Sequence, residues 1–195
     1  MIFLRNIPGS ADKLHKKTVG VAGCGGLGSN IAISLVRSGV GRLILADFDI
    51  IEASNLNRQQ YTQDDIGKLK VNVLSSYLKK INPRISIVTI EKELVPETIG
   101  YLFDEAEIMV EAFDNAESKL WLIESWVASF PDRPIIIGSG MAGIGDFDKI
   151  KVKKAGNLYI CGDGTSDMSQ GLMAPRVAIV ANLQAMTAIE ILLDK

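Results

Sequence analysis

A glycine turn is the first stretch whose residue types could do chemistry. Gly23, Gly25 and Gly28 have the G-x-G-x-x-G spacing, between a short apolar run and a helix-like stretch. Glycines at this spacing permit a tight turn and close approach of the backbone to a phosphate, which the free N–H groups of the helix's first turn then face. A second apolar run ends in Asp47, about twenty residues further on, where a carboxylate can bind ribose hydroxyls. The pattern predicts an adenine-nucleotide site and leaves open whether the nucleotide is ATP or a dinucleotide.

Charged side chains that follow later apolar runs favour ATP. Arg58 can bind a phosphate bidentately and Lys70 can act as a point charge, so together they could stabilise charge on a leaving pyrophosphate. Asp114 follows another apolar run and can hold Mg²⁺ that bridges phosphates. Hydride transfer would usually need a proton donor, and the only histidine, His15, is expected at the surface.

Apolar runs alternate with helical patterns along the chain, which predicts an α/β fold with a Rossmann-like, mainly parallel sheet and helices on both faces. The helix after Asp114 is expected to place Ala116, Leu120, Ile123 and Val127 on one face, with Trp121 and Trp126 packing beside it. An added, antiparallel strand is expected over 147–152. The expected strands are 18–22, 42–47, 84–90, 108–113 and 134–138, and the expected longer helices are 29–37, 64–82, 116–127 and 174–194.

Length and composition limit the domain organisation and the partners. With 195 residues, 47% of them hydrophobic, the chain is expected to form one domain over 1–195, with an N-terminal arm at 1–17 and a mobile crossing segment at 156–173.

A net charge of −2 predicts no general attraction to nucleic acid or to a membrane surface. The apolar segment 174–193 carries charged residues, so it is expected to be a buried helix. Two cysteines fit a reduced cytoplasm.

Several motifs together resemble the ThiF/MoeB/HesA adenylyltransferases, relatives of the adenylation domains of ubiquitin-activating enzymes. The resemblance covers nearly the whole chain, and N-L-N-R-Q following D-F-D is its most specific part. The matching text is G-C-G-G-L-G-S-N at 23–30, S-G-V-G-R-L-I-L-A-D-F-D at 38–49, S-N-L-N-R-Q at 54–59, I-G-K-L-K-V at 66–71, I-N-P at 81–83, D-N at 114–115 and A-P-R-V at 174–177.

The resemblance implies a reaction. Such enzymes bind ATP and Mg²⁺ and let the C-terminal glycine carboxylate of a ubiquitin-like carrier attack the α-phosphate, giving an acyl-adenylate and pyrophosphate. It implies catalytic roles for Arg58, Lys70 and Asp114, with Asp114 holding the metal, and a homodimer in which Arg5 reaches the partner's ATP. The nucleotide-binding residues that it implies are Gly23, Gly25, Gly26, Gly28, Asp47, Asp49, Asn55, Arg58, Gln59 and Lys70.

The chain also departs from the family pattern. Longer members carry paired C-x-x-C zinc ligands, whereas only Cys161 stands in that region, so no structural zinc is expected. Some thiamine-pathway members have a cysteine that links to the carrier where this chain has Asp167. Cys161 could substitute for it, but an isolated cysteine in a mobile loop is more often a bystander. Its shortness resembles compact ThiF proteins, which favours activation of a ThiS-like sulfur carrier ending in Gly-Gly, in thiamine biosynthesis.

Three other functions stay open at this point. Adenylation of a carboxylate on modified tRNA would keep the chemistry and change the acceptor. The chain could instead be a non-catalytic nucleotide-binding partner of a ubiquitin-like protein, which has the same fold but carries out no reaction. A plain NAD-binding domain is the remaining alternative.

Overall fold

The sheet has seven strands in the order β3-β2-β1-β4-β5-β7-β6. The computed structural model describes residues 2–194, so Met1 and Lys195, at the ends of the expected domain, lie outside the described residues. All neighbouring strands are parallel except the β6–β7 pair, which confirms the predicted fold class. The strands are β1 (Thr18–Ala22), β2 (Arg42–Ala46), β3 (Ser86–Ile90), β4 (Ile108–Glu111), β5 (Ile135–Gly138), β6 (Lys151–Ala155) and β7 (Leu158–Gly162).

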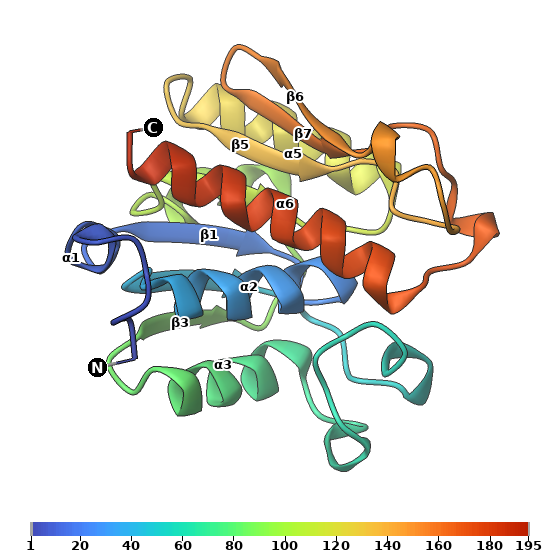
Figure 1. Ribbon diagram of the computed structural model, residues 1–195, viewed down its shortest axis with the longest axis horizontal. Helices are drawn as coiled ribbons and strands as arrows, with labels where there is room; N and C mark the ends of the chain where they lie inside the picture. Colours follow the sequence, from blue (N-terminus) through green and yellow to red (C-terminus); the bar gives the residue numbers. More distant parts are fainter. Residues whose placement is uncertain (1, 195) are drawn as a thin grey trace.

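Helices cover both faces of the sheet, and each side has its own apolar core. The larger core joins α2, α3 and α6 to one face, and the smaller one joins α4 and α5 to the other (Figure 1). No helix within residues 2–194 combines the length and the apolar character needed to cross a bilayer. The helices are α1 (Ser10–Leu14), α2 (Gly26–Ser38), α3 (Lys70–Ile81), α4 (Ile99–Leu102), α5 (Ala116–Ser129) and α6 (Ala174–Leu192).

The strand order reverses between β1 and β4. From β1 the chain adds β2 and β3 on one side, then crosses back to add β4, β5 and β7 on the other. In open α/β sheets ligands bind beyond the carboxyl ends of the strands at such a switch point. In Figure 1 the parallel strands point to the right, where their following loops gather, and both termini lie on the left.

Helix α3 begins later than the apolar periodicity predicts, at Lys70 and not at residue 64. Gly67 has a φ of 85°, which breaks a helix. The Asp65 carboxylate accepts hydrogen bonds from the Thr62 backbone N–H and hydroxyl, so this stretch forms a separate 3₁₀ turn. The later start makes Lys70 the first helical residue and buries it, with 7% of its surface exposed.

Two boundaries near the C-terminus also differ from the expectation. The added antiparallel strand is β6 at Lys151–Ala155, not 147–152. Part of the expected crossing segment is strand β7, which pairs with β5 on one side and β6 on the other. The crossing segment that connects β7 to α6 is therefore 163–173, and its mobility stays a prediction.

Helix α5 packs Trp126 in the core as expected, but it does not bury the predicted face as a whole. Leu122 and Trp126 are fully buried, whereas Leu120 and Val127 are exposed at the surface. Apolar residues occupy more than one face of this helix, so spacing alone does not select the core side. Trp126 decides the orientation, because its indole N–H donates to the Arg133 carbonyl and its ring packs in the smaller core.

Candidate functional site

A cavity of about 540 Å³ lies beyond the carboxyl ends of the strands at the switch point. We call it the edge cavity. It brings together the segments after β1, β2, β3, β4, β5 and β7, so residues far apart in sequence share one site. Its walls come from within segments 23–27, 46–49, 58–59, 92–94, 112–121, 138–142 and 166–172, together with Lys70 and Val177.

The glycine turn forms one wall of the edge cavity, and two of its glycines cannot be replaced without a clash. A Cβ at Gly28 would lie 1.8 Å from the Gly23 carbonyl oxygen, and Gly23 itself has a φ of 97° with the Ala112 carbonyl against it. Gly25 is the N-cap of α2 and provides no capping side chain. The first N–H groups of α2 are thus left to a ligand at the cavity wall formed by Gly25 and Gly26.

Asp47 is fixed at the end of β2 by two backbone hydrogen bonds. Its Oδ2 accepts from the Cys24 N–H at 2.6 Å and its Oδ1 from the Asp49 N–H at 2.8 Å. Burial raises the pKa of Asp47, and these two hydrogen bonds oppose that shift. A carboxylate has about four acceptor positions, so Asp47 can still accept hydrogen bonds from hydroxyl groups in the edge cavity.

Lys70 and Asp49 form an ion pair at the cavity wall, with 2.6 Å between Lys70 Nζ and Asp49 Oδ2. The lysine side chain is 9% exposed and the carboxylate 50% exposed. Lys70 is the first residue of α3, and a cation is unfavourable at the N-terminus of a helix because of the helix dipole. The Asp49 carboxylate offsets this cost, and an anionic ligand in the cavity would offset it further.

Arg58 and Gln59 lie beside the glycine turn. Arg58 is half-buried, and its Nη1 donates to the Ser54 carbonyl and to the Asn57 side-chain oxygen. Gln59 is buried, and its side-chain oxygen has no hydrogen-bond partner among the described residues. Both side chains line the edge cavity.

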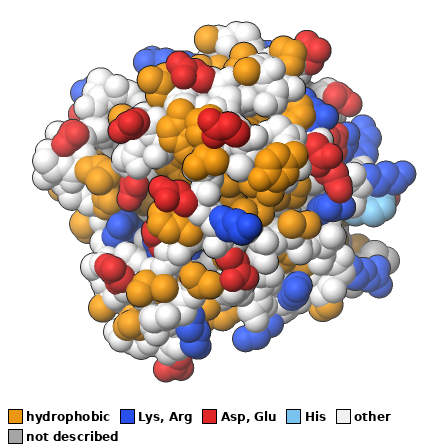
Figure 2. Space-filling view, turned by 180° about the vertical axis from the view of Figure 1, so that it is seen from behind, with side chains coloured by type: hydrophobic (Ala, Val, Ile, Leu, Met, Phe, Trp, Pro, Cys, Tyr) orange, Lys and Arg blue, Asp and Glu red, His pale blue; other side chains and the backbone are white. Residues whose placement is uncertain are grey.

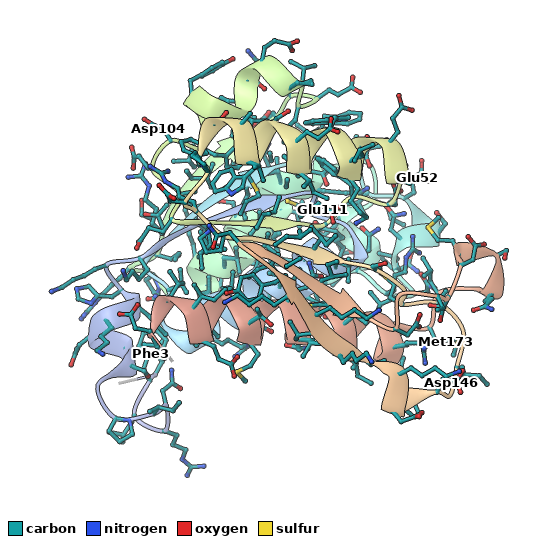
Figure 3. The ribbon with its side chains drawn as sticks, turned by 90° about the horizontal axis from the view of Figure 1, so that it is seen from above. Phe3, Glu52, Asp104, Glu111, Asp146 and Met173 are labelled. Carbon is teal, nitrogen blue, oxygen red and sulfur yellow. The ribbon has the colours of Figure 1, made fainter. Side chains whose placement is uncertain are left out.

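Three of the expected site residues are not in the cavity wall. Gly28 is buried under the turn, and the Asn55 side-chain oxygen accepts from the Glu52 N–H at 3.0 Å, which closes a local turn. Arg5 belongs to the N-terminal arm. Figure 3 shows Phe3 of this arm at the opposite end of the molecule from Met173, so Arg5 does not reach the edge cavity of its own chain.

Asp114 follows β4 and presents an exposed carboxylate to the edge cavity. No hydrogen bond or ion pair within residues 2–194 engages this carboxylate. Over the same residues, no three His, Cys, Asp or Glu side chains form a metal-binding group. A divalent cation would therefore depend on Asp114 together with ligand phosphates, which is how Mg²⁺ is commonly bound.

An ion pair between a buried carboxylate and a lysine of the cavity wall was missed by sequence reasoning. Glu111 at the end of β4 is fully buried, and its Oε2 accepts a hydrogen bond from Nζ of Lys119 on α5. Lys119 and Lys92 both line the edge cavity. The sequence does carry one signal: a glutamate ends an otherwise apolar strand, and a buried carboxylate needs a partner.

Cys161 is a fully buried residue of β7, not part of a loop, and burial raises the pKa of its thiol to about 11. Cys24 is buried as well. We therefore expect iodoacetamide at pH 8 to label neither thiol in the native protein and both after unfolding, because only an accessible thiolate reacts. Mass spectrometry of the two samples measures this, and rapid labelling of native Cys161 would reopen a covalent role for it.

Comparison with known proteins finds similar structures. *Escherichia coli* tRNA N6-threonylcarbamoyladenosine dehydratase, TcdA, has a TM-score of 0.86 at 19% identity, over 95% of this chain and 89% of that one. At this identity the likeness shows the fold alone. *E. coli* MccB has a TM-score of 0.75 at 27% identity, over 94% of this chain and 57% of that one.

Curated relatives match most of this chain but only part of their own length. The adenylyltransferase and sulfurtransferase MOCS3 of *Anopheles gambiae* is 30% identical over 93% of this chain and 43% of its own. The adenylyltransferase and sulfurtransferase uba4 of *Aspergillus niger* is 30% identical over 92% and 40%. The chain thus spans about two fifths of the length of these relatives. The model of the ThiF family matches residues 3–195, so the chain belongs to the ThiF family.

Proposed function

We propose that this chain binds ATP with Mg²⁺ and adenylates the C-terminal glycine carboxylate of a small ubiquitin-like sulfur carrier, releasing pyrophosphate. The observation that carries the proposal is one cavity that joins an uncapped helix N-terminus, a fixed carboxylate at Asp47, and the cations Arg58 and Lys70. MOCS3 and uba4 are named adenylyltransferases, and MccB was solved with ATP, which supports the same chemistry here.

Each part of the edge cavity suits one part of the nucleotide. Asp47 would accept hydrogen bonds from the ribose hydroxyls, and the N–H groups at Gly26 and Leu27 would bind phosphate oxygens. Arg58 and Lys70 would neutralise the β- and γ-phosphates and the charge that develops on the leaving pyrophosphate. Fixed cations and a rigid turn would mainly align the reactants, which is most of what phosphate-transfer catalysis requires.

The exposed carboxylate of Asp114 fits a magnesium ion that is shared with phosphates. When bound, the ion would supply additional neutralisation of phosphate charge. Asp49 is less suited to hold it, because its carboxylate already pairs with Lys70.

The acceptor is the finer part of the proposal. An ionised carboxylate can attack the α-phosphate without a protein nucleophile, which agrees with the burial of both cysteines. The sulfurtransferase names of the relatives support a sulfur carrier. A ThiS-like carrier in thiamine biosynthesis, in the cytoplasm, is the specific form of the proposal.

Arg5 enters the proposal only through a homodimer. Because the N-terminal arm lies at the far end of its own chain, Arg5 could approach an edge cavity only in a second copy. Its role at the partner's ATP remains part of the proposal.

Measurement of ATP–pyrophosphate exchange tests the proposed function. We expect exchange to require a carrier ending in Gly-Gly and to disappear when the carrier's C-terminal carboxylate is amidated, because the carboxylate is the nucleophile. Exchange with modified tRNA instead would identify the tRNA as acceptor. The mixture of acidic and basic side chains in Figure 2 and the net charge of −2 do not favour that outcome. ATP binding without exchange for any carrier would contradict the proposal.

A further inference from the structure

Lys119 is a cation of the edge cavity for which the proposed function has no role. It lies in the first turn of α5, beyond the end of β4, and its side chain is 21% exposed. Its Nζ donates to Oε2 of Glu111, whose other oxygen accepts from the Phe113 N–H at 2.7 Å. The buried carboxylate therefore fixes the position of the ammonium group.

Glu111 is itself held in place from the other side. It ends the central strand β4, where its backbone carbonyl accepts from the Gln184 side-chain amide of α6 at 2.9 Å. Figure 3 shows Glu111 in the middle of the molecule. A lysine ammonium has three N–H donors, so one bond to Glu111 leaves donors available on the cavity side.

The position of Lys119 along the sheet edge separates it from the glycine turn, Asp47 and Lys70, but places it on the same side of the switch point as Asp114, the proposed magnesium ligand. The glycine turn and Asp47 follow β1 and β2, and Lys70 pairs with Asp49 on that side. Lys119 follows β4, on the other side of the switch point, where Ser139 after β5 and Ser166 after β7 also line the cavity. If the nucleoside lies on the β1–β2 side and the phosphates reach toward Asp114, the space near Lys119 is left for the acceptor.

We propose that Lys119, positioned by Glu111, binds the carboxylate of the acceptor and aligns it for attack on the α-phosphate. This inference rests on the proposed function. A charge-assisted hydrogen bond from the ammonium would hold the carboxylate oxygen in its reactive, ionised form. Lys119 is thus a specificity residue for a carboxylate acceptor, and Glu111 is a positioning residue that acts through it.

Steady-state ATP–pyrophosphate exchange, measured once as a function of the carrier concentration and once as a function of the ATP concentration, tests the inference. In Lys119→Met we expect the KM for a carrier ending in Gly-Gly to rise about 10- to 100-fold, the range for losing one hydrogen bond between charged groups. The KM for ATP should stay within about twofold, because its proposed ligands are unchanged. Lys119→Arg, which keeps the positive charge, should retain most of the affinity for the carrier.

The double variant Glu111→Gln/Lys119→Met separates binding from a structural role. Lys119→Met alone leaves a buried carboxylate unpaired and should lower stability, whereas removing both charges should restore the urea midpoint. We expect the double variant to keep the high carrier KM despite this recovery. If the double variant had the carrier KM of the unchanged protein, or if its KM for ATP rose as much as its KM for the carrier, the inference about Lys119 would be overturned. The proposed function would still stand in that case. Absence of exchange in the unchanged protein would overturn the proposed function and the inference together.

Discussion

Arg58→Ala and Asp114→Ala should each reduce carrier-dependent ATP–pyrophosphate exchange by about 10²- to 10³-fold, the usual effect of removing one group that stabilises charge in a transition state. The aliphatic stem of Arg58 lies beside Gly26 of the glycine turn, and its guanidinium would neutralise the departing pyrophosphate from the cavity wall. Asp114→Ala would remove the carboxylate that is proposed to hold the shared magnesium ion. The exchange rate at saturating ATP and carrier measures both effects.

We expect these two substitutions to reduce the exchange rate through the chemistry of the site and not by destabilising the fold. Within residues 2–194 the Arg58 side chain donates only to its own loop, and the Asp114 carboxylate is exposed, so the thermal midpoint of either variant should stay near that of the unchanged protein. Arg84→Ala and Asp132→Ala are matched controls, because both side chains are exposed and outside the edge cavity. Exchange within threefold of the unchanged protein in either test variant would contradict the assigned roles.

Arg58→Lys adds a finer comparison. Lysine keeps the charge but lacks the planar fork that binds two phosphate oxygens at once. We therefore expect activity between that of the alanine variant and the unchanged protein, with a larger effect on turnover than on ATP binding.

The fold could be predicted from the sequence because its strongest signals are local. Short apolar runs that end in glycine or an acid, separated by helical patterns, indicate parallel strands, and β1 and β2 lie where these runs predict. The start of α3 could not be found in this way, because the side-chain bonds of Asp65 and the positive φ of Gly67 override the apolar periodicity. The β7 strand was missed because its flanking residues are polar and its pairing with β5 is not local.

The candidate site was predictable to the extent that motifs mark it. Asp47, Arg58 and Lys70 stand at motif positions, and the structure brings them to one cavity. The Glu111–Lys119 pair carries no motif, since its meaning depends on the burial of Glu111 beneath the cavity. Arg5 shows a different limit. It is expected to act in a second copy of the chain, and the structure of one chain does not show its position there.

A buried ion pair at the base of the crossing segment should have the largest effect on stability. Arg176 Nη2 lies 2.6 Å from Asp163 Oδ2, with the two side chains 5% and 2% exposed. Asp163 also accepts hydrogen bonds from Thr165 and Ser166, so it holds the segment that brings Ser166 to the edge cavity. We expect Asp163→Asn to lower the free energy of unfolding by about 3–5 kcal/mol, because it leaves the buried Arg176 charge unpaired. Urea unfolding at pH 7 measures this loss.

The same pair should give the stability a defined pH dependence. Burial alone would raise the pKa of Asp163, but hydrogen bonds from Ser166 and Thr165 and the Arg176 guanidinium together hold it below its usual value of 3.8. A carboxyl whose pKa is lower in the folded state stabilises the protein above pH 3.8, and this contribution is lost as the pH falls further. The difference between the unchanged protein and Asp163→Asn should therefore be full at neutral pH and shrink below this value.

Two further variants separate the buried pair from general charge effects. Asp163→Asn/Arg176→Met removes both charges and should recover part of the lost stability, since no buried guanidinium is left unpaired. Asp146→Asn breaks the exposed pair with Lys149, whose side chains are 63% and 54% exposed, and should change the urea midpoint little. Equal losses in Asp146→Asn and Asp163→Asn would show that burial does not set the strength of these pairs. Unequal losses, with partial recovery in the double variant, would assign the anchoring of the crossing segment to Asp163 and Arg176.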